Sequence, residues 1–169
     1  MREAESPSAL RLGSASSRSG LTKNLRYWLP VVLWMAFIFG LSTDAGSPRH
    51  TSRIIGPLLR WINPEISDEA IQSVQLVIRK SAHLTEYAIL ALFVWRARRQ
   101  PVRGERRPWR RADAFCAFAV AALFAVTDEW HQSFIPSREG KFLDVLIDST
   151  GAALGLLACW SFGRWRKLW

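Results

Sequence analysis

The sequence contains little cysteine and few acidic residues. Two cysteines in 169 residues cannot form the network of disulfides that holds a small secreted domain together, so a disulfide scaffold is excluded. The 14 acidic residues are outnumbered by 23 lysines and arginines, which leaves a net charge of +9. Averaged over the chain, that charge and a mean hydropathy of +0.02 suggest a small basic protein that binds nucleic acid.

The average misleads, because charged and apolar residues occupy different stretches of the chain. The chain is 49% hydrophobic, which excludes a disordered polymer, and its length allows one domain. Long apolar segments occur at residues 25–41, 81–95, 114–126 and 143–162. A membrane-spanning helix needs roughly 17–25 such residues. The third segment reaches that length only when it is extended to residues 112–130, which brings Asp128 and Glu129 to the membrane edge, and the fourth contains Asp148.

The first apolar segment has a second interpretation as a secretory signal, because basic residues precede it. No small-residue cleavage pattern closes it and the basic lead-in is long, so we favour a retained helix. Residues 1–24, rich in serine and without an apolar period, are predicted to be a flexible tail, and residues 25–163 to be the membrane domain.

Basic residues are concentrated in three segments, at residues 2–26, 96–111 and 164–167. With four spans all three segments lie on one side, and short loops rich in lysine and arginine stay in the cytoplasm. We therefore predict an all-α polytopic protein of the cytoplasmic (inner) membrane, with four transmembrane helices and both termini cytoplasmic. Orientation and attraction to anionic lipid explain the arginine run 96–111 more simply than nucleic acid does, so we expect the bilayer and no nucleic acid as a partner.

The predicted outer segment, residues 42–77, contains apolar residues that favour a short interfacial helix, broken near Pro57: Ile54, Ile55, Leu58, Leu59 and Trp61. Ser67 is a good helix N-cap, and Asp68 and Glu69 suit the positive end of a helix dipole. The second spanning helix is therefore predicted to run from about residue 68 to about residue 95.

Ionisable and polar residues gather at the outer ends of three predicted spans. Arg79, His83 and Glu86 share one face of the second span, and Asp144 and Asp148 share one face of the fourth. A charge within a span costs roughly 2.5–3.5 kcal/mol, so such groups pair or line a polar cavity. We infer one outward-facing vestibule, with Gly151 and Gly155 allowing close helix packing below it. Its predicted ligand-binding residues are Arg79, Lys80, His83, Glu86, Tyr87, Asp128, Glu129, His131, Gln132, Arg138, Asp144 and Asp148.

Three interpretations of the vestibule remain open. The charges can form only a structural network of ion pairs. They can bind the anionic headgroup of a lipid-linked molecule, with Arg79 and Arg138 holding phosphate. They can also hold a divalent metal that activates water against a phosphoester. The spacing matches no strong metalloenzyme signature, so the sequence assigns no metal, no cofactor and no catalytic residue, and it leaves enzymatic activity and oligomeric state undetermined.

The polar residues also carry a resemblance that covers about residues 27–162. The matching motifs are Arg79-Lys80-x-x-His83-x-x-Glu86-Tyr87, Asp128-Glu129-x-His131-Gln132-x-Phe134-x-Pro136-x-Arg138, Asp144-x-x-x-Asp148-x-x-Gly151 and the pair Leu41-Ser42. In these motifs the sequence resembles the VanZ-like family of small bacterial membrane proteins. The resemblance implies a polytopic membrane protein of the cell envelope, and the family's namesake is associated with low-level resistance to the glycopeptide antibiotic teicoplanin. It implies no established catalytic residues. We therefore expect a lipid-linked envelope precursor as the partner, and teicoplanin susceptibility as a trait to test.

Overall fold

The computed structural model describes residues 7–43, 48–101, 107–136 and 140–169. The described residues form five helices and no strands. The helices are α1 (Pro7–Leu41), α2 (Pro48–Ile62), α3 (Asp68–Arg99), α4 (Arg111–Gln132) and α5 (Phe142–Trp165). The prediction of an all-α protein is therefore confirmed for the part of the chain that the structure describes.

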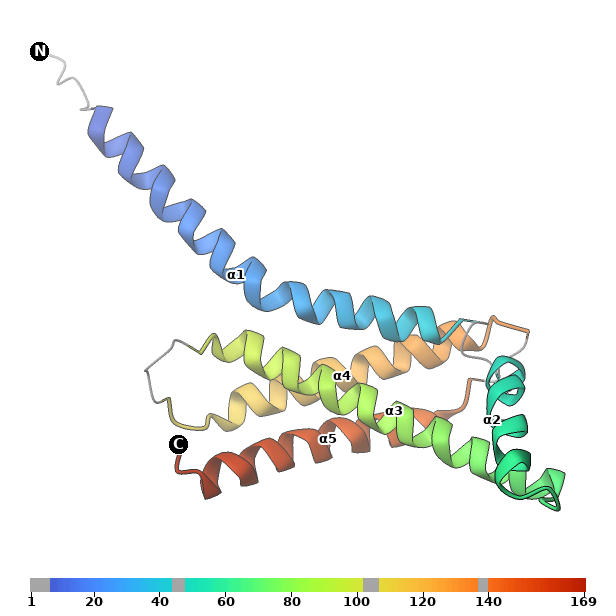
Figure 1. Cartoon of the computed structure of the whole chain (residues 1–169). Helices are drawn as coiled ribbons and strands as arrows, with labels where there is room; N and C mark the ends of the chain where they lie inside the picture. Colours follow the sequence, from blue (N-terminus) through green and yellow to red (C-terminus); the bar gives the residue numbers. More distant parts are fainter. Residues whose placement is uncertain (1–6, 44–47, 102–106, 137–139) are drawn as a thin grey trace, which may run out of the picture.

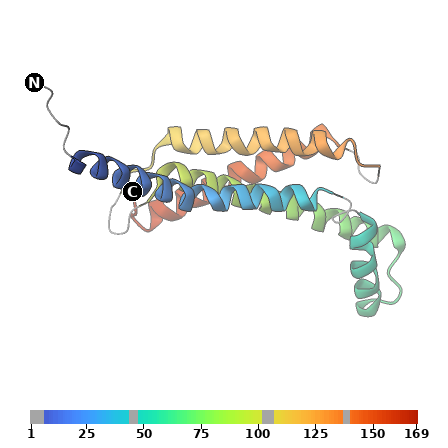
Figure 2. The same cartoon turned by 90° about the horizontal axis from the view of Figure 1, so that it is seen from above.

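The four long helices run alternately in opposite directions along one bundle (Figure 1). Helix α3 contacts each of the other four helices, and α4 also packs against α5. Helix α2 lies across the end of the bundle where α3 and α5 begin and where α1 and α4 end (Figures 1 and 2). Each long helix thus joins the same two ends of the molecule.

Small side chains fill much of the interior, while large apolar side chains lie on the outside. The buried small residues are Ala91, Ala97, Ala117, Ala121, Ala125 and Ala152. The exposed large residues include Leu29, Leu33, Phe115, Leu123, Leu154 and Leu157. A water-soluble protein gathers its large apolar side chains inside, whereas helices in lipid approach each other through small residues. This distribution is typical of a bundle that faces lipid.

Two of the described helical segments are long and apolar enough to cross a membrane, namely Asn24–Leu41 of α1 and Phe142–Trp165. Helices α3 and α4, which carry many of the ionisable residues described below, are not among them. Four spans therefore remain a prediction.

Two glycines bring α5 against α3. A Cβ atom on Gly151 would lie 2.8 Å from Cα of Leu84, and one on Gly155 would lie 2.9 Å from Cα of Ala88. Real Cβ atoms do not approach backbone so closely, so only glycine fits at either position. The predicted close packing of a helix against these glycines is confirmed.

The start of α3 agrees with its predicted cap, since the Ser67 side chain accepts a hydrogen bond from the backbone N–H of Ala70 at 3.2 Å. The helix ends at Arg99 rather than near residue 95. The short helix expected around residues 54–61 is present as α2, but the break near Pro57 was wrong, because α2 continues through that residue. A proline removes only one backbone donor, and the neighbouring hydrogen bonds hold the helix together.

Helix α1 begins at Pro7 and so includes most of the segment that was predicted to be a flexible tail. Alanine, leucine and arginine, which favour helix, are frequent between residues 8 and 15. A helix that is already formed over residues 25–41 can extend toward its N-terminus without a second costly nucleation step.

Candidate functional site

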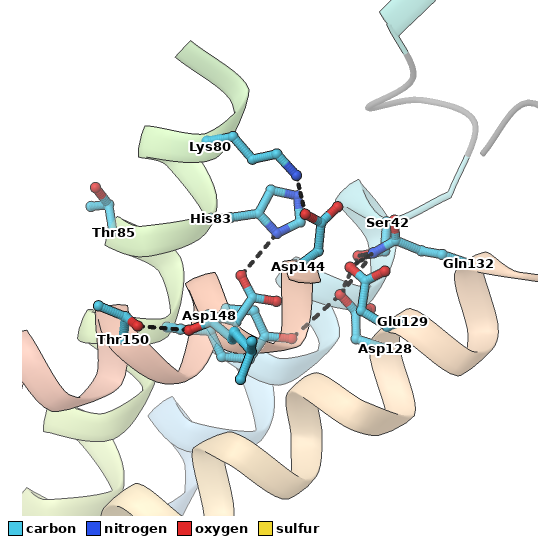
Figure 3. Close-up of polar contacts among 12 residues, drawn as sticks. Ser42, Lys80, His83, Thr85, Asp128, Glu129, Gln132, Asp144, Asp148 and Thr150 are labelled. Carbon is cyan, nitrogen blue, oxygen red and sulfur yellow. Dashed lines mark hydrogen bonds and ion pairs between the residues drawn. The ribbon is translucent and has the colours of Figure 1, made fainter. Parts of the chain in front are cut away.

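Polar side chains from α3, α4 and α5, together with Ser42 after α1, meet at the α2 end of the bundle (Figure 3). Helical spacing explains why several side chains of one helix point the same way, since residues four apart share a face. His83 and Tyr87 are such a pair on α3, Asp128 and Gln132 on α4, and Asp144 and Asp148 on α5. The polar cluster consists of Ser42, Lys80, His83, Tyr87, Asp128, Glu129, Gln132, Asp144 and Asp148.

His83 and Asp148 link α3 to α5. Nδ1 of His83 lies 3.1 Å from Oδ1 of Asp148, and the Asp148 side chain is fully buried (Figure 3). Because a carboxylate accepts hydrogen bonds, Nδ1 is the donor in this contact. The second oxygen of Asp148, Oδ2, is buried and has no hydrogen-bond partner in the part of the chain that the structure describes.

One carboxylate oxygen of Asp128 accepts three hydrogen bonds. Its Oδ2 accepts from Oγ of Ser42 at 2.7 Å, from Nε2 of Gln132 at 3.2 Å and, more weakly, from the hydroxyl of Tyr87 at 3.4 Å. Asp128 is fully buried, and its Oδ1 has no hydrogen-bond partner. The uncharged donors stabilise the carboxylate but leave half of it available.

Glu129 connects the Asp128 network to the start of α5. Its Oε1 accepts from Nε2 of Gln132 at 3.3 Å, and its Oε2 accepts from the backbone N–H of Lys141 at 2.9 Å. Lys141 is the N-cap residue of α5, so the buried carboxylate lies at the positive end of that helix dipole. One oxygen from Glu129, one from Asp148 and one ring nitrogen from His83 all lie within 4.8 Å of one another.

Lys80 forms an ion pair with Asp144 at the rim of the polar cluster, where both side chains are partly accessible. The described cluster thus contains four carboxyl groups and, as basic groups, only this lysine and His83. Buried charges are normally paired or coordinated to a metal. The cluster is therefore short of positive charge among the described residues.

The sequence profile of the VanZ/LLP1 family matches residues 27–163, which include the whole polar cluster. The chain belongs to the VanZ/LLP1 family. The resemblance found in the polar motifs is thereby confirmed. Comparisons with curated proteins and with solved structures gave no match.

Three residues that the sequence predicted for the vestibule of this VanZ/LLP1 protein lie apart from the polar cluster or outside the described residues, and a fourth, Glu86, interacts with His83 through its charge. The ring of His131 stacks on Phe39 with centroids 4.1 Å apart. Arg79 is half-buried and forms no hydrogen bond or ion pair with the cluster among the described residues. Glu86 is half-buried, and its backbone carbonyl accepts from Nε1 of Trp34 at 2.9 Å. Arg138 lies outside the described residues.

Ser42 belongs to the cluster but was not predicted as a site residue. A serine after an apolar segment has many ordinary roles, so its own position carries little information. The signal that could have identified it was the pair Leu41-Ser42, which belongs to the VanZ-like motifs. Its hydroxyl brings the end of α1 to the buried carboxylate of Asp128.

Proposed function

We propose that this VanZ/LLP1 protein spans the cytoplasmic membrane four times, with both termini in the cytoplasm, and that its polar cluster faces outward. In that position the cluster binds the anionic headgroup of a lipid-linked molecule of the cell envelope. Teicoplanin susceptibility is the trait expected to respond to it, as the resemblance to VanZ implies.

The alternating helix directions support four spans. Each long helix joins the two ends of the bundle (Figure 2), and many large apolar side chains are exposed on its outside. The end opposite the polar cluster, which we call the arginine end, carries Arg96, Arg98, Arg99, Arg110 and Arg164. Segments rich in arginine remain in the cytoplasm, so the polar cluster takes the outer position.

One observation carries the proposal of a binding site: two buried carboxylate oxygens, Oδ1 of Asp128 and Oδ2 of Asp148, have no hydrogen-bond partner among the described residues. A network that served only to join helices would gain by satisfying these atoms, because an unsatisfied buried polar group costs about 1–3 kcal/mol. Side chains that remain incompletely paired at membrane depth mark a site for a ligand.

Lys80 supports an anionic headgroup as that ligand. It lies at the rim, partly accessible, and its ion pair with Asp144 can be exchanged for one with a phosphate oxygen. The exposed apolar side chains on the outside of the bundle can contact the tail of such a lipid.

Binding of a fluorescent polyprenyl phosphate by the purified full chain in phosphatidylcholine nanodiscs tests the proposal, with the uncharged polyprenol as comparison. The phosphate should bind more tightly, and Lys80→Met should weaken it about tenfold or more, as loss of a charge-assisted hydrogen bond predicts. Arg164→Met is the matched control, because it removes an exposed cation at the arginine end.

Equal binding of phosphate and alcohol by the wild-type chain would overturn the proposal. If Lys80→Met and Asp144→Asn both fail to accumulate as folded protein, the ion pair serves the structure and the interpretation as a structural network is correct. Comparable loss in Arg164→Met would show that the effect is general to positive charge and not specific to the cluster.

A further inference from the structure

The three helices α3, α4 and α5 each place one metal-ligand type at a single point inside the polar cluster. His83 offers a ring nitrogen, and Glu129 and Asp148 each offer a carboxylate oxygen, all within 4.8 Å of one another. We propose that these three side chains bind one divalent cation, and that this cation receives the phosphate of the headgroup. The second half of the inference rests on the proposed function, whereas the cation site itself rests on the atoms described next.

The spacing of the three atoms is close to that of a coordination sphere. Zinc bonds to histidine nitrogen and carboxylate oxygen are about 2.0–2.2 Å long, so the ligand atoms of one tetrahedral ion lie about 3.3–3.6 Å apart. Nδ1 of His83 and Oδ1 of Asp148 are already 3.1 Å apart, and Nδ1 can bind the ion once the imidazole takes the tautomer that carries its proton on Nε2. A separation of 4.8 Å would need to shorten by about 1.3 Å, a movement that a change of side-chain rotamer can supply.

An unused oxygen points to a ligand independently of this spacing. Oδ2 of Asp148 has no hydrogen-bond partner among the described residues, and the whole side chain is inaccessible to solvent. A cation at the centre of the three side chains would take one oxygen of Asp148 and draw the carboxylate away from its present single contact with His83.

Neighbouring groups hold the ligands in place, as in metal sites that are built into a fold. Glu129 is held by the N–H of Lys141 and by Gln132. Gln132 is in turn hydrogen-bonded to Asp128, and the packing of α5 against α3 at Gly151 fixes the level of Asp148 opposite His83. Such outer contacts orient metal ligands and raise affinity.

Charge explains why an anion-binding site would need the cation. Asp128, Glu129, Asp144 and Asp148 surround the point where a phosphate would enter, and Lys80 is engaged with Asp144. Like charges in a low-dielectric environment repel strongly, so a phosphate would meet unfavourable electrostatics there. A divalent cation would reverse the sign of the local electrostatic potential and offer open coordination positions to phosphate oxygens.

The ligand set selects the class of metal. One imidazole and two carboxylates form a mixed nitrogen and oxygen set, which suits Zn²⁺ or Mn²⁺ better than the all-oxygen sites preferred by Ca²⁺. Three protein ligands leave at least one position open. The inference concerns binding only and assigns no bond-breaking step.

The test is metal content of the purified full chain in nanodiscs. The protein is stripped with a chelator, equilibrated with Zn²⁺ or with Mn²⁺ and freed of unbound ion before elemental analysis. We expect one ion per chain in the wild type and at least a tenfold loss of affinity in His83→Ala and Asp148→Asn. His131→Ala should retain the ion, because His131 stacks on Phe39. Asp68→Asn should also retain it, because Asp68 pairs with Arg60 outside the cluster.

A measurement on the wild type covers the case in which the variants do not fold. Co²⁺ replaces Zn²⁺ at nitrogen and oxygen sites, and its visible absorption bands should appear at one equivalent and disappear on addition of Zn²⁺. Absence of bands together with absence of stoichiometric Zn²⁺ and Mn²⁺ overturns the cation site. Retention of the ion in His83→Ala would also overturn it.

Headgroup binding separates this inference from the proposed function. Stripped protein that binds polyprenyl phosphate as tightly as loaded protein would overturn the bridging role of the cation while the proposed function stands. Loaded protein that holds one ion and does not distinguish the phosphate from the alcohol would overturn the proposed function while the cation site stands. A phosphate affinity that rises at least tenfold on loading supports both.

Discussion

The two ends of the bundle handle charge in opposite ways. At the arginine end, Arg96 lies over the ring of Tyr27 at 5.2 Å, and Arg99 lies over Trp95 and Trp169 at 5.1 Å each. At the other end, carboxylates of the polar cluster are buried and held by hydroxyl, amide and imidazole groups. The exposed Arg96 side chain rests on an aromatic ring and still reaches water, whereas a short aspartate on an inward helix face cannot.

A buried aspartate at each end makes the contrast sharper. Asp113 at the arginine end lies 3.6 Å from a guanidinium nitrogen of Arg98 and 3.9 Å from one of Arg110. Asp148 in the polar cluster has one hydrogen-bonded partner, His83, and keeps an oxygen without a partner. The difference teaches that burial of an acid alone does not mark a functional site. A buried acid that keeps a carboxylate oxygen without a hydrogen-bond partner does mark such a site.

The largest expected effect concerns the sidedness of the two ends. In a chain with Cys116→Ala and Cys159→Ala, we expect a membrane-impermeant thiol reagent to label Glu65→Cys in intact cells and to leave Arg110→Cys unlabelled. Both positions are exposed and lie at opposite ends of the bundle. Labelling of Arg110→Cys alone would place the polar cluster in the cytoplasm, and the proposed outward site would be wrong.

The paired aspartates provide the next test. Asp148→Asn should weaken binding of polyprenyl phosphate about 30-fold or more, because the variant loses a ligand of the proposed cation that receives the phosphate. Asp113→Asn should change that affinity by no more than about twofold, since distant sites contribute independently. Titration in nanodiscs measures both. Similar losses in the two variants would show that the ends do not differ in function.

A smaller effect is expected when α3 and α5 are forced apart. Gly151→Ala places a Cβ atom 2.8 Å from Cα of Leu84, so the free energy of unfolding should fall by about 1–3 kcal/mol, as in overpacked cores. Gly40→Ala is the matched helical control, because nothing lies within 4 Å of its added Cβ atom. Thermal unfolding in detergent, followed by circular dichroism, compares the variants. Equal stability of Gly151→Ala and the wild type would contradict the close packing.

The smallest effect is expected at the arginine end. Arg99→Gln removes a cation over two tryptophan rings and should lower the free energy of unfolding by about 0.5–1 kcal/mol. Its affinity for polyprenyl phosphate should equal that of the wild type. A decrease in affinity as large as that of Lys80→Met would mean that both ends of the bundle contribute to binding.

The local features of the chain were predictable. Several features follow from residue spacing within one segment. They are the cap at Ser67 with the start of α3, the short helix α2, and the close-packed glycines Gly151 and Gly155 on α5. The extent of α1 was not predictable, because a serine-rich sequence does not decide whether the helix of the following apolar segment continues through it. Pro57 was misjudged for a related reason, since one lost hydrogen bond does not end a helix whose other bonds persist.

The sequence by itself determined the all-helical class, the family and the levels at which polar residues occur along each helix. These depend on apolar runs, on motif spacing and on a helical period that every residue shares. Only the tertiary structure decided which polar side chains meet. It brought His83, Glu129 and Asp148 together, added Ser42 and directed His131 to Phe39. The physical reason is that the rotation of each helix about its own axis is set by contacts with the other helices, and no single segment contains that information.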